Sequence, residues 1–221
     1  MLRVARDGAF WLTFVLLNCL LFLPLYLFHL EETAFLPWPI TATSAGALLS
    51  ELTFWRANLD LFRINVEFVL LITLWVLIRG VRGRLLQWAI IILYALTLLY
   101  AIYEAFTLAV YQVEPVFYNH FTMYKDGFAF LLKHANVSMV AIVGGTLLLT
   151  LAAAATVLLL RMLLSRSAAG ISTFSTLMLL VLALVVVAPL LRHQTALANP
   201  QMVVSSFGYK LQQNVAHSVE G

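Results

Sequence analysis

The sequence predicts an all-α polytopic membrane protein with five transmembrane helices. Composition, the length of the apolar runs and the placement of arginine all point to this fold class. Of the 221 residues, 63% are hydrophobic and only 10% are charged, whereas soluble domains carry about 25% charged residues. About 20 apolar residues are needed to cross a bilayer as a helix. Five runs of suitable length occur, and they give the predicted crossings: 8–30, 61–78, 85–110, 137–160 and 171–191.

Arginine residues orient these crossings, because basic residues in short loops stay on the cytoplasmic side of the membrane. The turn between the second and third runs reads Arg79-Gly80-Val81-Arg82-Gly83-Arg84, and further arginines lie at alternate ends of the runs. The intervening segments hold most of the acidic residues. The pattern predicts a cytoplasmic N-terminus and an extracytoplasmic C-terminus. The further arginines that indicate the cytoplasmic side are Arg3, Arg6, Arg161 and Arg166. The acidic residues on the other side are Glu31, Glu32, Glu51, Asp60, Glu114 and Asp126.

The first apolar run follows a basic head, as a signal peptide does, but it is longer than a signal-peptide core and lacks a small-residue cleavage site. It is therefore interpreted as a retained signal anchor. The single cysteine, Cys19, excludes an intrachain disulfide and a cysteine-based metal site. The sequence shows no catalytic motif, and we predict no metal, no cofactor and no nucleic-acid partner. Whether the chain is part of an enzyme stays open.

The segments expected outside the membrane hold interfacial helices. Residues 41–52 form either an ordered connecting loop or an amphipathic helix that holds lipid near a reaction centre. The aromatic stretch 111–136 is expected to lie at the interface, with a short helix over 128–134. Residues 192–221 form an extracytoplasmic tail, following the domain 1–191, with an amphipathic helix over 202–215.

The ionisable residues within the predicted crossings are the candidate functional residues. Glu67 and Glu104 each lie about 9 Å below the outer surface, at 1.5 Å per residue. Arg63 precedes Glu67 by four residues, so the two are expected to pair on one helix face. Asn65 and Tyr100 complete the group. It is either a polar clamp that fixes helix packing or a cleft that receives a lipid headgroup or an ion, because a charge at this depth needs a partner.

Two further features predict contacts between helices. Asn18, in the middle of the first run, is expected to form a hydrogen bond with a neighbouring helix rather than to bind a ligand. Gly144 and Gly145 offer a smooth surface for close helix packing, and the small residues Ala152 to Ala155 extend it.

Several stretches resemble the membrane domain of lipoteichoic acid synthase-like and other sulfatase-like membrane proteins of the alkaline phosphatase superfamily. These are residues 54–63 (Phe-Trp-Arg-Ala-Asn-Leu-Asp-Leu-Phe-Arg), residues 100–111 with the aromatic stretch 117–121, and Asn199-Pro200 with the segment after it. The resemblance implies a bacterial plasma (inner) membrane protein whose helices anchor an extracytoplasmic enzyme near its lipid substrate. That family's catalytic domain is absent from this chain, so no catalytic residue carries over.

Three functions remain open at this point. The first is a non-catalytic membrane domain that anchors or positions an extracytoplasmic sulfatase-like or phosphoglycerol-transferase-like enzyme near lipid headgroups. The second is a structural subunit of a larger membrane complex, with the glycine and alanine surface binding other subunits. The third, a small transporter, would need polar residues at several depths and has no internal repeat to support it.

The predicted topology can be tested at the C-terminus. A tag fused after Gly221 should react with a membrane-impermeant reagent in intact cells, because the fifth crossing ends outside. A tag that reacts only after the membrane is permeabilised would contradict the five-crossing topology.

Overall fold

The computed structural model describes residues 2–28, 63–78, 83–111, 139–192 and 204–220. In this part of the chain the fold is helical, with one pair of very short strands. The helices predicted over 41–52 and 128–134 lie outside the described residues. The helices are α1 (Leu2–Phe28), α3 (Val66–Leu77), α4 (Arg84–Tyr111), α6 (Met139–Ala168), α7 (Thr173–Arg192) and α8 (Phe207–Glu220), and the strands are β1 (Ile64–Asn65) and β2 (Val204–Ser205).

Three of these helices are long and apolar enough to cross a membrane, over Arg6–Leu25, Arg84–Leu108 and Thr146–Ala168. The chain is therefore an integral membrane protein on the length and composition of its helices. Shorter apolar segments occupy Val66–Leu77 and Thr173–Ala188. The 12-residue α3 is about 18 Å long at 1.5 Å per residue, which is less than the hydrocarbon core of about 30 Å.

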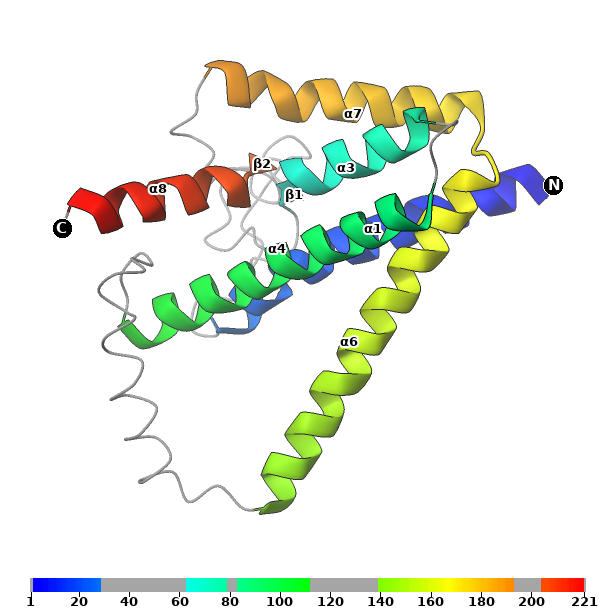
Figure 1. Cartoon of the computed structure of the whole chain (residues 1–221). Coiled ribbons are helices and arrows are strands. Elements are labelled where there is room, and N and C mark those ends of the chain that lie inside the picture. The colour runs from blue at the N-terminus through cyan, green and yellow to red at the C-terminus, as the bar shows by residue number, and fades with distance from the viewer. Residues whose placement is uncertain (1, 29–62, 79–82, 112–138, 193–203, 221) are drawn as a thin grey trace, which may run out of the picture.

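The helices lie side by side with α1 at the centre of the packing. α1 packs against α4 and α6, and α3 packs against α7 and α6. Apolar residues three or four apart bury one face of α1, including Phe10, Phe14, Leu17 and Leu21. As Figure 1 shows, the first half of α6 leaves the other helices and projects away from them.

An aromatic chain holds three of the helices together. The ring of Phe68 on α3 stacks on Phe14 of α1, with 5.1 Å between the centroids. The same ring meets Tyr94 of α4 edge-on at 5.5 Å. The Tyr94 hydroxyl donates to the carbonyl of Leu17 over 2.7 Å, so this buried phenol is satisfied by the backbone of α1.

One end of the bundle, which we call the arginine end, carries Arg6, Arg84, Arg161 and Arg166. The start of α1 and the turn between α6 and α7 meet there (Figure 1). Arg166 donates to the carbonyl of Ala9 and to the Thr13 hydroxyl, each over 3.0 Å. Asp7 accepts from the Ser172 amide and the Ser175 hydroxyl, over 3.2 and 3.0 Å. The N-terminal helix and the α6–α7 turn are therefore held together by an arginine of α6 and an aspartate of α1.

The α6–α7 turn differs from its predicted position. The fourth crossing was predicted to end at residue 160, before Arg161 and Arg166, but α6 continues through these residues to Ala168. The guanidinium groups are accommodated on the helix, because Arg166 reaches α1 and Arg161 lies over a Trp88 ring. The turn falls instead at Gly170, whose φ of 89° favours glycine.

The second predicted crossing, 61–78, also begins differently. Residues 64–65 are extended and α3 starts only at Val66. Arg63 therefore lies outside the helix, and the predicted pairing with Glu67 on one helix face is corrected. β1 runs parallel to β2, with Ile64 opposite Val204 and Asn65 opposite Ser205.

Asn18 holds this extended segment against α1. Its side-chain amide donates to the Arg63 carbonyl over 2.6 Å, and its oxygen accepts from the Asn65 amide over 3.0 Å. The partner of Asn18 is thus the backbone just before α3 rather than the side of a helix. Asn18 and Asn65 are both buried, so these bonds satisfy backbone groups that would otherwise be buried without partners.

Replacing Asn18 should destabilise the fold. Asn18→Leu keeps the volume but leaves two buried backbone groups without partners, which costs about 1–3 kcal/mol for each group. The free energy of unfolding, measured in detergent by denaturant titration, should therefore fall by about 2–6 kcal/mol for the two groups together. Leu16→Ala, at an exposed position on the same helix, is the matched control and should have a much smaller effect.

Candidate functional site

The site is built around Glu67, in the first turn of α3. Asn65 caps this helix, because its side-chain oxygen accepts from the Phe68 amide over 2.7 Å. The Asn65 side-chain amide donates to Glu67 Oε2 over 2.8 Å. Asparagine at the cap and glutamate in the first turn both favour a helix start at this point.

The Glu67 carboxylate also binds the start of α8. It accepts from the Gly208 amide at 2.9 Å, the Phe207 amide at 3.3 Å and the Ser206 hydroxyl. Ser206 in turn accepts from the Tyr209 amide over 3.1 Å and so caps α8. Two helix N-termini converge on one carboxylate, and the partial positive charge of each stabilises an anion there.

Gly208 favours this contact. A Cβ added at Gly208 would lie 3.0 Å from Glu67 Oε1, which is closer than ordinary contact distances. The absence of a side chain lets the carboxylate approach the backbone of α8. A glycine one residue inside a helix start, otherwise unfavourable, is explained by this approach.

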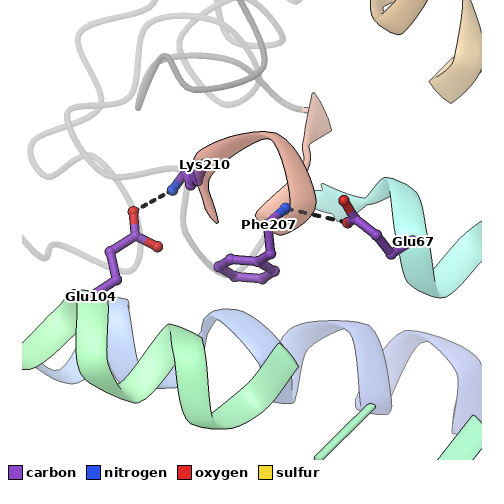
Figure 2. Close-up of polar contacts among 4 residues, drawn as sticks. All are labelled: Glu67, Glu104, Phe207 and Lys210. Atoms are coloured by element: carbon purple, nitrogen blue, oxygen red, sulfur yellow. Dashed lines mark hydrogen bonds and ion pairs between the residues drawn. The ribbon is translucent and has the colours of Figure 1, made fainter. Parts of the chain in front are cut away.

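Glu104, on α4, binds the next turn of α8. It forms an ion pair with Lys210 Nζ (Figure 2). The Lys210 ammonium also lies 5.5 Å from the centroid of the Phe207 ring. The two side chains are about nine-tenths buried, so the pair is shielded from water and each charge depends on the other.

Phe207 fills the space between the two carboxylates (Figure 2). Its ring stacks on Phe22 of α1 at 5.5 Å and meets Tyr100 of α4 edge-on at 5.9 Å. Tyr100 therefore contributes an aromatic wall to the site. Phe207 is buried, and it anchors the start of α8 to the bundle by apolar contact as well as by charge.

Glu104 retains an unused acceptor. Its Oε2 atom is buried and accepts no hydrogen bond in the part of the chain that the structure describes. Thr107, one turn further along α4, has a buried hydroxyl in the same condition. Because the two residues are three apart, they share a face of the helix. Two buried polar atoms on this face of α4 therefore have no hydrogen-bond partner among the described residues.

The structure brings together most of the residues that the sequence singled out, but through an unforeseen element. Glu67 and Glu104 do not bind each other: α8 lies between them and gives each its partner. Arg63 is buried beside this group, just before β1. Lys210, Ser206 and Gly208 were missed, because they lie in a polar segment interpreted as an external tail. A lysine on a predicted amphipathic helix was the sequence feature that could have indicated a partner for a buried glutamate.

Gly144 and Gly145 lie on α6, away from the site around Glu67 and Glu104. Gly144 is on the projecting half of α6, and a Cβ there would meet nothing within 4 Å. The neighbouring Gly145 is in the same helix. Among the described residues no group of three or more histidine, cysteine, aspartate or glutamate side chains could hold a metal ion.

Comparison with known proteins identifies no relative. No model of a known protein family matches the chain. No curated protein and no solved structure is significantly similar to it. The resemblance to sulfatase-like membrane proteins therefore stays a prediction from sequence.

The Glu104–Lys210 pair should control the attachment of α8. Lys210→Met leaves the Glu104 carboxylate buried without its counter-charge, which typically costs about 3–5 kcal/mol for a buried pair. Amide hydrogen exchange over residues 204–220 should become much faster in this variant. The double variant Glu104→Gln/Lys210→Met should recover part of the protection, because no lone charge remains.

The control for this experiment is Gln212→Met, an exposed position on the same helix. If Lys210→Met exchanges no faster than Gln212→Met, the ion pair does not hold α8.

Proposed function

We propose that this chain is a non-catalytic membrane domain that positions an extracytoplasmic sulfatase-like or phosphoglycerol-transferase-like enzyme near lipid headgroups. In this proposal the chain crosses a bacterial inner membrane five times, with the arginine end in the cytoplasm. α3 and α7 complete the five crossings. The 12-residue α3 and the two extended residues before it are together about 25 Å long, so in this proposal the bilayer is locally thinner around them.

The observation that carries the proposal is the attachment of residues 204–220 to the bundle. Three independent contacts hold this segment: the β1–β2 pairing, the Glu67 carboxylate at the start of α8, and the Glu104–Lys210 ion pair. A flexible linker needs none of these contacts. A segment held this firmly would fix the height and orientation of an enzyme bound to it or continuous with it.

The free acceptor of Glu104 supports the lipid part of the proposal. Glu67 is already saturated by donors of its own chain, so Glu104 and Thr107 are the better candidates to receive a hydroxyl or ammonium group of a lipid. Of the two alternatives left open by the sequence, the contacts of Glu67 fit the structural clamp.

The proposal is tested by isolating the tagged protein from its native membranes. The isolate should contain a sulfatase-like catalytic domain, either on the same polypeptide or as a stoichiometric companion, identified by mass spectrometry. The variant Lys210→Glu places two acids in contact and should reduce headgroup-transfer or hydrolase activity in these membranes at least tenfold, while the protein still inserts. An isolate with no sulfatase-like domain would refute the proposal.

Gln212→Glu is the matched control, because it adds the same negative charge to α8 at an exposed position. It should leave both activity and insertion unchanged. Equal loss of activity in both variants would show that the charge of α8, rather than its attachment, matters.

A second function, a structural subunit of a larger membrane complex, is favoured by the projecting half of α6. Large apolar side chains are exposed there and Gly144 is open. Other subunits could cover this surface, although lipid would satisfy it equally. A stable multi-subunit assembly without a sulfatase-like member would favour this function over the first. The exposed side chains include Val143, Leu147, Leu148, Leu149 and Leu151.

A further inference from the structure

Three exposed side chains at the arginine end, two arginines and a tryptophan, form a surface on α4 and α6. The guanidinium carbon of Arg161 lies 4.8 Å from the centroid of the Trp88 ring. Arg84 precedes Trp88 by four residues, so both project from the same face of α4. Arg84 and Arg161 are exposed and Trp88 is 46% exposed. We call these three residues the guanidinium shelf.

The shelf lacks a counter-ion within the described residues. Of the carboxylates whose side chains the structure describes, Glu67 and Glu104 bind α8, and Asp7 accepts from Ser172 and Ser175. Two other arginines of this end have hydrogen-bond partners on neighbouring helices and turns. Arg166 donates to Ala9 and Thr13, and Arg6 donates to the Ala169 carbonyl over 3.3 Å.

Arg161 lies inside an apolar helix. It falls within the membrane-spanning stretch Thr146–Ala168, about 10 Å from the end of that stretch at 1.5 Å per residue. A guanidinium at this depth must reach an anion or the headgroup region. Stacking on Trp88 directs it along the surface of α4, and tryptophan itself favours the headgroup level.

Beside the shelf, on the side of the bilayer centre, the surface is apolar. Ile92 follows Trp88 by four residues on α4, and Leu158 precedes Arg161 by three on α6; both are exposed. Because the two helices run in opposite directions (Figure 1), both residues lie on the same side of the shelf. A cationic shelf bordered by an apolar stripe matches the shape of a lipid with an anionic head.

We infer that the guanidinium shelf binds the phosphate of an anionic phospholipid, whose acyl chain lies along Ile92 and Leu158. Arginine binds phosphate through two parallel N–H donors. Basic surfaces between transmembrane helices on the cytoplasmic side are known to recognise anionic headgroups. This inference concerns the opposite end of the bundle from the α8 attachment, so either can fail without the other.

The inference is tested by titrating the purified, delipidated protein with dioleoylphosphatidylglycerol and counting bound lipid by native mass spectrometry. Dioleoylphosphatidylcholine is the uncharged comparison and should bind at least tenfold more weakly. Arg161→Gln should weaken phosphatidylglycerol binding about tenfold, the loss of one charge-assisted contact. Arg161→Lys keeps the charge but loses the two parallel N–H donors of the guanidinium group. Its affinity for phosphatidylglycerol should lie between those of the wild-type protein and Arg161→Gln.

Arg6→Gln is the matched control, because it removes the same charge from the same end but not from the shelf. It should bind phosphatidylglycerol as the wild-type protein does. Equal weakening by Arg6→Gln and Arg161→Gln would overturn the inference in favour of diffuse charge attraction. Competition by soluble glycerol 3-phosphate at the same concentration as the lipid would also overturn it, because the acyl chain would then contribute nothing.

Arg84→Gln provides a second variant whose side chain is exposed and whose loss should not affect folding. It should weaken phosphatidylglycerol binding in the same direction as Arg161→Gln, with an unchanged melting temperature. Unaltered binding in both variants would overturn the inference.

Discussion

The Glu67 carboxylate is the constraint on which the rest of the structure depends. An ionised group inside an apolar bundle must be compensated, and here the compensation comes from hydrogen-bond donors rather than from a neighbouring arginine. Asn65 supplies one donor, and the start of α8 supplies a hydroxyl and two amides. Both α3 and α8 must therefore begin at this carboxylate. The start of α3 directly after β1, and the absence of a side chain at position 208, are consistent with this constraint.

The two ends of the bundle solve the same electrostatic problem in different ways. At the arginine end, Arg166 and Asp7 bind polar groups of neighbouring helices, and the exposed guanidinium groups can reach the membrane surface. Glu67 is half-buried and Glu104 is buried, and α8, which is amphipathic and otherwise polar, supplies partners to both. An element that sequence composition assigns to the aqueous phase thus becomes part of the helical bundle.

The sequence was informative where apolar surface alone determines structure. The long helices α1, α4 and α6 follow from runs that can satisfy their backbone only as helices in lipid. Prediction from the sequence failed where contacts with a segment far away in the chain determine the local structure. Nothing near Arg63 shows that residues 64–65 are extended, because their partners are Val204 and Ser205. The Arg161 to Arg166 segment resembles a loop, yet contacts with Trp88, Ala9 and Thr13 keep it helical.

The β1–β2 pairing also dictates the order in which the protein can mature. The paired residues Ile64 and Val204 are far apart in the chain, and ribosomes add about 5–20 residues each second. About 7 to 28 seconds then pass between the synthesis of Glu67 and the synthesis of its partners on α8. During that interval the Glu67 carboxylate lacks the donors that the start of α8 supplies. The bundle around Glu67 is therefore completed only after residues 204–220 have been synthesised.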